Sequence, residues 1–325
     1  MSPRCLIVQP IHADGLAVLR AADVEAVAAS APDMATVARE IVGCDAVITR
    51  NAGLDRHAID AAERLLVIGN HGVGLDPVDV EHASALGIPV VFTPAANAVA
   101  VAEHAVALVL AVAKQLLDAD RATRAGDFGF KYHRRIRELR GTTLGVVGFG
   151  RIGRLTAEAL VRGLGMRLLA YAPSAPSAAI EALGGTRAAS LDALLEASDV
   201  ISLHVPLRDS TRGLIGAREL ALCKPDAILV NTARGAIVDE DALVAALREG
   251  RLAGAGLDVY ASEQMSPDHP LLALPNALLT PHAGASSDAA GRRTAVQVAE
   301  QVVAVVRGRR PEHLVNPEVW SRRRG

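Results

Sequence analysis

The chain has 325 residues, half of them hydrophobic, with a formal net charge of -2 and only 2% aromatic residues. This length predicts two domains, and the high hydrophobic content with so little net charge excludes a disordered chain. Near-neutral charge and few rings argue against nucleic-acid binding, which needs a basic face and stacking platforms.

Cysteine content and the lengths of apolar runs indicate the cellular setting. The three cysteines, Cys5, Cys44 and Cys223, are scattered and form neither a disulfide framework nor a metal-binding spacing, so we expect reduced core residues in a cytoplasmic protein. The longest apolar helical run, Ala105–Ala113, has about half of the ~20 residues needed to cross a bilayer. We therefore expect no metal site, no membrane association and no signal sequence.

Short β-branched runs alternate with Ala- and Leu-rich helical segments along the whole chain. Most expected strands are continuous apolar runs, which is typical of parallel sheets covered by helices on both faces. In chain order the strands are expected at Leu6–Gln9, Ala46–Thr49, Leu66–Ile68, Val90–Phe92, Leu144–Val147, Leu168–Tyr171, Val200–Leu203, Ile228–Asn231, Gly256–Val259 and Leu278–Thr280. Apolar spacing of i, i+3 and i+4 predicts helices at Asp33–Val42, Arg151–Leu164, Leu191–Ala197 and Asp239–Glu249.

This alternation predicts an α/β protein with two doubly wound parallel-sheet domains. Two long helices, about Ala98–Leu117 and Ser286–Arg307, lie where the character of the chain changes, and we interpret them as crossings between the domains. The first domain is then expected to comprise residues 1–98 and 286–325. The second, residues 99–285, is inserted into it.

The clearest motif is a strand that runs into Gly148, Gly150 and Gly153, spaced Gly-x-Gly-x-x-Gly, and then into a helix. Gly148 permits the tight turn, Gly150 lets a pyrophosphate approach the backbone, and Gly153 lets the helix pack closely on the strand. Free N–H groups at the start of the helix, at Arg151 and Ile152, then face the phosphates. The turn predicts a Rossmann domain that binds NAD or NADP.

The position that normally selects NAD is unusual in this chain. An acidic residue about 20 positions after the glycine turn is expected to bind the adenosine ribose, but the second strand is followed by Ala172, Pro173 and Ser174, and the next carboxylate is Glu181. Candidate donors to a 2′-phosphate are Ser174, Ser177, Arg151 and Arg154. We hypothesise that NADP is at least tolerated, and the preference between NAD and NADP stays open.

Three further segments place reactive side chains just after expected strands. Arg234 follows the strand that ends at Asn231, Glu263 follows the next strand, and His282 follows the last. Because ligands bind at the carboxyl ends of strands in an open parallel sheet, we expect these three residues to meet in one crevice beside the cofactor.

Together these segments resemble the D-isomer-specific 2-hydroxyacid dehydrogenase family, most closely its D-3-phosphoglycerate dehydrogenase-like branch. The resemblance covers nearly the whole chain and includes His71–Asp76, Asn97–Glu103 and His204–Leu207. It implies a Rossmann nucleotide-binding domain inserted into a flavodoxin-like substrate domain. It also implies hydride transfer between NAD(P)H and C2 of a small anionic 2-keto or D-2-hydroxy acid, and a homodimer in which the nucleotide-binding domains pair.

The resemblance assigns roles that agree with this chemistry. Arg234 would fork onto the substrate carboxylate and carbonyl oxygen and stabilise the negative charge that develops during reduction. His282 would give a proton to that oxygen, since histidine exchanges protons readily near neutral pH. Glu263 would bind the other ring nitrogen and so fix the tautomer.

Other contacts are implied less specifically. Asp258 is expected to hold the nicotinamide carboxamide, and Arg50, Val73 and Gly74 to contact the substrate from the first domain. The alternative for Arg50 is a surface salt bridge, and no role is assigned to His71. The remaining cofactor contacts are expected from Ala172, Ser174, His204, Val205, Pro206, Thr211, Thr232, Ala233 and Gly284.

Three questions stay open. The basic segment Lys131–Arg137 is either a solvated loop or a dimer arm that places cations near an active-site mouth and attracts a small polyanion. Alternative functions are a dinucleotide-sensing co-regulator on the same scaffold and an enzyme acting on formate or phosphite. The intact set of Arg234, Glu263 and His282 favours an enzyme of 2-hydroxy acids, because a sensor needs no acid/base pair. The identity of the acid stays open.

Overall fold

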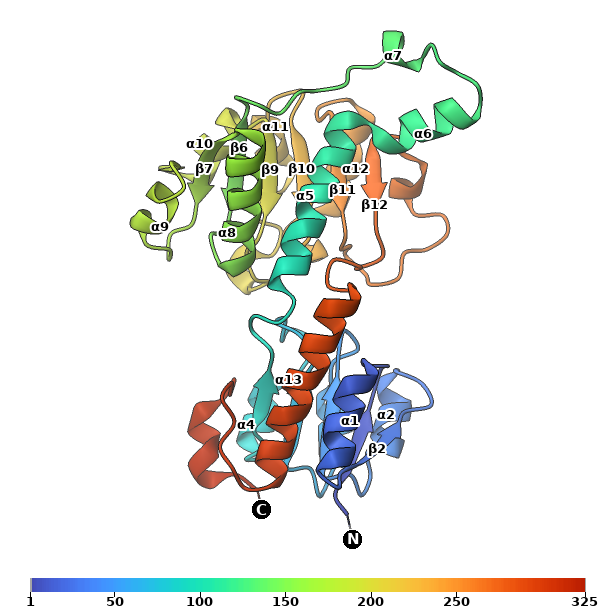
Figure 1. The fold of residues 1–325 in the computed structure, drawn as a ribbon, viewed down its shortest axis with the longest axis vertical. Helices are drawn as coiled ribbons and strands as arrows, with labels where there is room; N and C mark the ends of the chain where they lie inside the picture. Colours follow the sequence, from blue (N-terminus) through green and yellow to red (C-terminus); the bar gives the residue numbers. More distant parts are fainter. Residues whose placement is uncertain (1, 325) are drawn as a thin grey trace. The chain divides into compact units, whose positions relative to one another are not determined.

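The computed structural model describes residues 2–324, which form two compact units (Figure 1). Unit 1 comprises the chain up to Asn97 and from Ser286 onward, and unit 2 comprises Ala98–Ala285. Each unit is built on one parallel β-sheet with helices packed against it. The predicted architecture of two parallel-sheet α/β domains is confirmed.

The sheet of unit 1 has the strand order β2-β1-β3-β4-β5, and all pairs are parallel. Its strands are β1 (Arg4–Ile7), β2 (Glu25–Ala28), β3 (Ala46–Thr49), β4 (Val67–Asn70) and β5 (Val90–Phe92). Helices α1 (Ala13–Ala21) and α13 (Asp288–Val306) share a hydrophobic cluster with Cys5 and Ile7. Helices α2 (Met34–Glu40), α3 (Arg56–Ala61) and α4 (Val80–Ala85) share another with Leu6. Alternate residues of one strand thus enter different cores, which is why the strands are apolar throughout.

The sheet of unit 2 has the strand order β12-β11-β10-β9-β6-β7-β8, again parallel throughout. Its strands are β6 (Thr143–Val147), β7 (Arg167–Tyr171), β8 (Thr186–Arg187), β9 (Val200–Leu203), β10 (Ile228–Asn231), β11 (Gly254–Leu257) and β12 (Ala277–Leu279). The order of connection reverses at β6, which pairs with both β7 and β9. Ligands of open α/β sheets bind beyond the carboxyl ends of the strands at such a reversal.

Helices link these strands. They are α5 (Ala98–Lys114), α6 (Leu116–Arg124), α7 (Phe130–His133), α8 (Arg151–Glu158), α9 (Ser177–Glu181), α10 (Leu191–Ala197), α11 (Ala217–Leu222) and α12 (Glu240–Arg248). Ser190 and Asp239 cap α10 and α12, each accepting a hydrogen bond from a backbone N–H at about the third helical residue. In both helices the capping side chain comes directly before the apolar periodicity, as is typical of a helix start.

The expected strands agree with the observed ones to within two residues, but two strands were missed. Both β2 and β8 are edge strands, short and partly exposed, so they have no continuous apolar run. The prediction of a single helix over residues 98–117 is wrong, because α5 ends at Lys114 and α6 begins at Leu116. The chain breaks at Gln115, whose φ of 50° is left-handed, and the backbone N–H of Arg137 bonds the carbonyl of Ala113 in the last turn of α5. Within residues 2–324 no single helix is long and apolar enough to span a membrane, although α5 and α6, bent by 56°, meet that criterion as a pair.

Candidate active site

The glycine turn between β6 and α8 has the geometry of a phosphate cradle. Gly148 has φ of 92°, and a Cβ there would lie 2.7 Å from the carbonyl group of His204. A Cβ on Gly153 would lie 2.2 Å from the carbonyl oxygen of Gly148, so this glycine lets α8 approach the turn. Gly150, at the start of α8, has nothing within 4 Å of its missing Cβ. Packing thus requires glycine at positions 148 and 153. Gly150 leaves space in front of the start of α8, and this space fits a pyrophosphate.

The expected cofactor residues all follow strands at the carboxyl edge of the unit 2 sheet. Gly148–Gly153 follow β6, Ala172 and Ser174 follow β7, His204–Pro206 precede Thr211 after β9, Thr232 and Ala233 follow β10, Asp258 follows β11, and Gly284 follows β12. This common edge is the observation that brings them together. It is also the edge at which the chain leaves β6 and β9, the paired neighbours at the reversal of strand order.

Two side chains along this edge have properties that suit a dinucleotide. The ring of His204 contacts the hydroxyl of Ser202 at 2.8 Å, and burial lowers its pKa to about 4, which keeps the ring neutral at neutral pH. The hydroxyl of Thr232 is buried and has no hydrogen-bond partner within the described residues. Because buried hydroxyls normally find a partner, this hydroxyl fits a contact to a bound cofactor.

The loop that carries Arg234 is held by its own backbone contacts. The amide of Asn231 accepts from the N–H of Ala233 at 3.0 Å and donates to the carbonyl of Arg234 at 2.9 Å. A Cβ on Gly235 would lie 1.8 Å from the carbonyl oxygen of Tyr260, so only glycine permits this approach of the two loops. The segment Asn231–Gly235 therefore fixes the backbone position from which the partly buried side chain of Arg234 extends.

His282 and Glu263 form a close pair. The Nδ1 atom of His282 lies 2.8 Å from Oε1 of Glu263, and the two side chains are 24% and 56% exposed. An ion pair this exposed contributes little to stability. The contact engages Nδ1 and orients the ring.

The backbone of His282 is also unusual. Its φ of 52° is left-handed, and its N–H donates to the carbonyl oxygens of Asp258 at 2.9 Å and Thr280 at 3.0 Å. Left-handed conformations of non-glycine residues are uncommon and cluster at functional sites, where surrounding contacts hold them. Here the hydrogen bonds to the carbonyls of Asp258 and Thr280 stabilise the left-handed conformation of His282.

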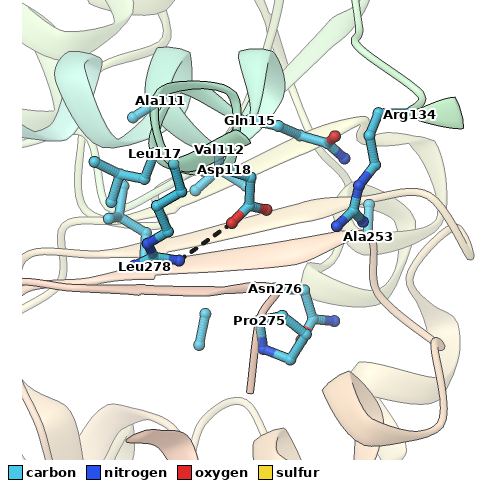
Figure 2. A pocket seen from close by; sticks show the side chains of 12 residues that line it. Ala111, Val112, Gln115, Leu117, Asp118, Arg134, Ala253, Pro275, Asn276 and Leu278 are labelled. Atoms are coloured by element: carbon cyan, nitrogen blue, oxygen red, sulfur yellow. Dashed lines mark hydrogen bonds and ion pairs between the residues drawn. The ribbon is translucent and has the colours of Figure 1, made fainter. Parts of the chain in front are cut away.

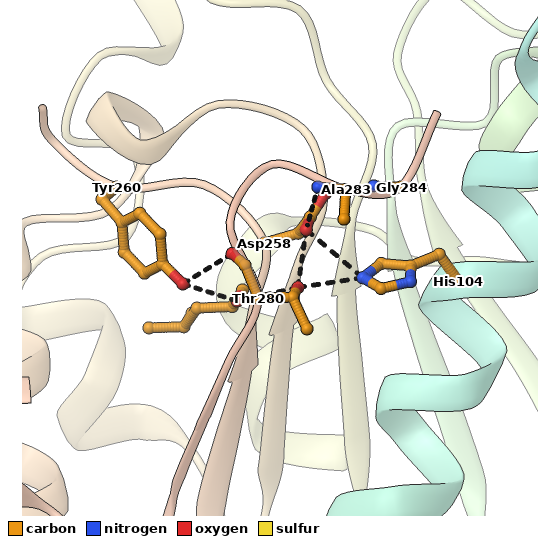
Figure 3. A network of polar contacts seen from close by, with 7 residues as sticks. His104, Asp258, Tyr260, Thr280, Ala283 and Gly284 are labelled. Atoms are coloured by element: carbon orange, nitrogen blue, oxygen red, sulfur yellow. Dashed lines mark hydrogen bonds and ion pairs between the residues drawn. The ribbon is translucent and has the colours of Figure 1, made fainter. Parts of the chain in front are cut away.

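Asp258 is the centre of the polar network in Figure 3. Its side chain is almost fully buried, and its two oxygens accept hydrogen bonds from the N–H groups of Ala283 and Gly284, each at 2.8 Å, and from the hydroxyl of Thr280 at 2.6 Å. Nε2 of His104 lies 3.3 Å away. Burial alone would raise the pKa of Asp258, but these hydrogen bonds, led by those from His104 and Thr280, hold it below its usual value. An ionised carboxylate thus fixes the backbone that follows His282 and the side chain of Thr280 that precedes it.

The sequence predicted Asp258 but missed three of its neighbours. His104 on α5 contacts the Thr280 hydroxyl at 2.9 Å. The hydroxyl of Tyr260 donates to the carbonyl of Thr280 at 2.7 Å, and burial raises the pKa of Tyr260 to about 12, so it stays a donor. Thr280 stands in the same segment as His282 and could have been found there. Nothing local to His104 or Tyr260 signals these contacts, because their partners are distant in sequence.

Unit 1 carries the expected substrate contacts at the carboxyl edge of its own sheet. Arg50 follows β3 and donates from Nη1 to the carbonyl of Pro10 at 2.8 Å. Within residues 2–324 no carboxylate lies within salt-bridge distance of Arg50, so this structure gives no support to the alternative of a surface salt bridge. The amide of Asn70 donates to the carbonyls of Gly72 and Gly74, which fixes the turn that contains Val73. Arg50 therefore lies beside an ordered turn with a main-chain carbonyl as its hydrogen-bond partner.

His71 also lies at this edge of unit 1. Burial, together with the charge of Arg50, lowers the pKa of His71 to about 4. Its Nε2 is buried without a partner among the described residues. The ring is therefore neutral at neutral pH.

The basic segment Lys131–Arg137 lines a different part of unit 2. Arg134 borders a hollow of about 160 Å³ together with Gln115, Arg121 and the residues around Asn276 (Figure 2). Asn276 precedes β12, so the hollow lies at the amino ends of the strands, opposite the edge that carries His282. Arg134 of one copy is therefore at the wrong edge to serve the crevice of the same unit.

The cysteines and candidate metal ligands add no further site. Cys5, Cys44 and Cys223 are buried free thiols, and burial raises the pKa of Cys223 to about 11. The expectation of small core cysteines is confirmed. Across residues 2–324, no group of three His, Cys, Asp or Glu side chains is arranged to hold a metal ion.

Comparisons with known proteins agree with this geometry. The family model described as D-isomer specific 2-hydroxyacid dehydrogenase, NAD binding domain, matches residues 106–284. D-3-phosphoglycerate dehydrogenase of Methanocaldococcus jannaschii is 38% identical over 314 residues, which are 96% of this chain but 59% of that protein. Glyoxylate reductase of Korarchaeum cryptofilum is 40% identical over 292 residues, which are 89% of this chain and 87% of that protein.

A solved structure is similar along its whole length. The NADPH-dependent glyoxylate/hydroxypyruvate reductase of Sinorhizobium meliloti, in complex with NADP and malonate, has a TM-score of 0.88 and 32% identity to this chain, with all of both chains covered. The likeness therefore extends to both units.

Proposed function

This chain belongs to the D-isomer-specific 2-hydroxyacid dehydrogenase family of NAD(P)-dependent oxidoreductases, and from that premise we propose that it transfers hydride between NAD(P)H and C2 of a small 2-keto or D-2-hydroxy acid. The observation that carries the proposal is the His282–Glu263 contact of 2.8 Å, at the same sheet edge as Arg234 and the glycine turn. An acid/base pair in this place favours catalysis over dinucleotide sensing. The comparisons offer no support for a co-regulator.

The residues at this edge have different roles in the reduction of the keto acid. When bound, the dihydronicotinamide supplies the hydride. Arg234 donates to the carboxylate and to the carbonyl oxygen of the keto acid, which orients C2 and stabilises the charge that develops on that oxygen. His282 gives the proton on Nε2 to the same oxygen, while Glu263 holds Nδ1 and fixes the orientation of the ring. In the oxidation direction His282 takes the proton back.

We propose that the dinucleotide lies along the carboxyl edge of unit 2. Gly150 and the start of α8 would hold the pyrophosphate, and the turn after β7 would hold the adenosine ribose. Asp258 and Gly284 would hold the carboxamide, with Asp258 acting mainly through the backbone groups that it binds. His204, which is neutral, and Thr232, whose hydroxyl has no partner in the described chain, would contact the part of the dinucleotide that lies between its adenosine and its carboxamide.

The substrate is a small anion in this proposal. Arg50, with no carboxylate partner in the described chain, and the ordered turn of Val73 and Gly74 would contact the acid from unit 1. The names of the relatives, glyoxylate reductase and D-3-phosphoglycerate dehydrogenase, also favour a substrate of a few carbon atoms. Few aromatic residues are present to line a larger pocket.

A substrate panel tests the proposal. Glyoxylate, hydroxypyruvate, phosphohydroxypyruvate, pyruvate and branched 2-keto acids are each offered with NADH and with NADPH, and loss of nicotinamide absorbance is followed. We expect kcat/KM to be highest for a small anionic keto acid and to fall for the branched ones. Failure to reduce every acid with either cofactor, or equal activity on aldehydes that lack a carboxylate, would contradict the proposal.

We further propose a homodimer formed through unit 2. Five exposed large hydrophobic side chains occur between residues 116 and 136, namely Leu116, Leu117, Phe128, Tyr132 and Ile136, and every residue of α6 is at least partly exposed. In Figure 1 the segment α6–α7 extends as an arm from the body of this unit. Exposed apolar side chains gathered on one segment are typical of an interface. A second copy would cover them.

Sedimentation tests the dimer. The unaltered chain is expected to sediment as a dimer, and the double variant Phe128→Ser, Tyr132→Ser as a monomer. Val42→Ser, which changes an exposed apolar residue of unit 1, is the control and should stay dimeric. A monomeric unaltered chain would overturn the dimer, and a dimeric double variant would overturn its placement on the arm.

The dimer also gives the basic segment a role. Because Arg134 lies at the amino edge of its own sheet, we propose that Lys131–Arg137 of one copy serves the active-site mouth of the other. The double variant Arg134→Ala, Arg135→Ala should then raise KM for a polyanionic substrate at low salt. An unchanged KM for every active substrate would contradict this role.

We also propose that the protein works in the cytoplasm, where its free thiols would stay reduced. Fluorescence microscopy of the tagged chain in its own cell would show a diffuse cytoplasmic signal. A signal confined to the envelope would contradict this location.

A further inference from the structure

The turn that follows β7 forms the part of a Rossmann site that meets the 2′ position of the adenosine ribose. Ala172 begins this turn, is nearly buried, and has no charge. The first carboxylate after it is Glu181, at the far end of α9. The turn therefore lacks the acceptor that binds a ribose 2′-hydroxyl and repels a 2′-phosphate.

One arginine from the neighbouring strand holds this turn. Arg187 lies on β8, where it pairs with Ala170 of β7. Its Nη1 donates to the carbonyl of Ala172 at 3.0 Å, and its Nη2 donates to the carbonyl of Ala175. A single guanidinium thus spans the turn from its first residue to the residue before Pro176.

The charge of Arg187 is not neutralised by the protein. Within residues 2–324 no carboxylate lies within salt-bridge distance of Arg187, and its Nε is buried without an acceptor. Carbonyl oxygens supply only partial negative charge, so a net positive charge stays at the turn. Pro173 and Pro176 stiffen the turn by fixing φ, and Ser174 between them is exposed.

We propose that Arg187 selects NADP(H): its charge beneath the turn after β7 attracts the 2′-phosphate, and Ser174 is the second donor. A dianionic phosphate gains far more from this charge than a ribose hydroxyl does. The sequence suggested Ser174, Ser177, Arg151 and Arg154 as donors, and the proposal adds Arg187 to these candidates. Arg187 was missed because β8 is a short edge strand without an apolar run.

Arg187 could instead be only a clamp that keeps the turn folded, and the two roles differ in what a variant loses. Loss of a clamp weakens every adenosine ligand equally. Loss of a phosphate-binding charge weakens only ligands that carry the 2′-phosphate. Two nucleotides that differ in this group alone separate the roles.

Calorimetric titration with adenosine 2′,5′-bisphosphate and with adenosine 5′-monophosphate is the test. The unaltered protein should bind the bisphosphate about 10–100-fold more tightly, the range of one hydrogen-bonded charge. Arg187→Met should abolish most of this ratio and leave the Kd of the monophosphate within about twofold, a change too small for a lost charged contact. Arg187→Lys, which keeps the charge without the fork, should retain part of the ratio.

Two controls complete the design. Arg167→Met removes another arginine of the same sheet, at the start of β7, and should leave both affinities unchanged. Ala172→Asp adds the missing acid and should reverse the preference. Equal weakening of both nucleotides in Arg187→Met, or equal affinity of the unaltered protein for both, would overturn the proposal.

The inference rests on the proposed dinucleotide site, and the same titrations test that site separately. Gly150→Val, which fills the open space before α8, should weaken both nucleotides, since each carries the 5′-phosphate. If the unaltered protein binds neither nucleotide, the dinucleotide site itself is wrong. If it binds the monophosphate and has no preference for the bisphosphate, only the role of Arg187 is wrong.

Discussion

The carboxyl edge of the unit 2 sheet is built differently at its two ends. At the end formed by β11 and β12, the buried carboxylate of Asp258 is bonded to a hydroxyl, two backbone N–H groups and the ring of His104. At the end formed by β7 and β8, one side chain, Arg187, holds the turn. Many mutual hydrogen bonds keep the geometry around His282 constant, whereas at the other end a single side chain supplies the charge that a ligand meets. The end formed by β11 and β12 therefore suits catalysis, which needs a constant geometry. The end formed by β7 and β8 suits discrimination between NAD and NADP.

The left-handed backbone of His282 shows what the dense end achieves. A non-glycine residue in this conformation costs about 1–3 kcal/mol and persists only where neighbours impose it. Two carbonyls accept from the N–H of His282, and Asp258 binds the next two N–H groups along the chain. The ring therefore meets Glu263 from a fixed backbone rather than by a chance surface contact.

The largest effect is expected from His282→Ala. Loss of the proton donor should lower kcat on the order of 10²–10⁴-fold, while the Kd of NADPH, measured by fluorescence, stays nearly unchanged because the adenosine end is intact. His269→Ala is the matched control, since His269 also contacts a glutamate, Glu240, at 2.9 Å in the same loop region. Its kcat should fall far less. An unaltered kcat in His282→Ala would reject the assignment of the proton donor.

Thr280→Val measures how much the dense network contributes to stability. The variant keeps the shape of the side chain but removes the hydroxyl that Asp258 binds at 2.6 Å. Leaving a buried carboxylate short of a donor should lower the free energy of unfolding by about 1–3 kcal/mol. Urea denaturation is the measurement.

The control for this variant is Thr142→Val, in the same unit, whose hydroxyl donates only to the main-chain carbonyl of Leu139. It should cost about 0.5–1.5 kcal/mol. If Thr280→Val destabilises no more than this control, the network around Asp258 is not the stabilising feature that distinguishes the two ends.

A pH-dependent effect extends the comparison to unit 1, where His71 lies beside Arg50. Its pKa is about 4 in the folded chain and about 6.5 when unfolded, so between these values the unfolded chain binds the additional proton. Stability should therefore fall as the pH decreases from about 6.5 to 4, by up to about 1.4 kcal/mol per pH unit for one such group. The buried His204 contributes with the same sign.

His71→Gln should flatten this slope, as measured by urea denaturation across the pH range, whereas His57→Gln, which changes an exposed residue, should not. A slope in His71→Gln equal to that of the unaltered chain would show that His71 is not buried in its neutral form.

Much of this molecule follows from its sequence, because parallel strands buried on both faces leave continuous apolar runs. The glycine turn and the three residues placed after strands lead to one edge of one sheet, so Arg234, Glu263 and His282 were identifiable. Three features were not. Strand β8 with Arg187 is too short and exposed to show a pattern, the break at Gln115 requires a left-handed residue that is not glycine, and the contact of His104 with Asp258 joins residues distant in the chain. Each depends on tertiary contacts rather than on local preference.

Transfer of a labelled hydride tests the central claim most directly. The chain is incubated with a small 2-keto acid and NADPH that carries deuterium on the transferred position of the nicotinamide, and the product is analysed by mass spectrometry and chiral chromatography. The account predicts the D-2-hydroxy acid with one deuterium bonded to C2. A product without deuterium at C2, or the L-isomer, would contradict it.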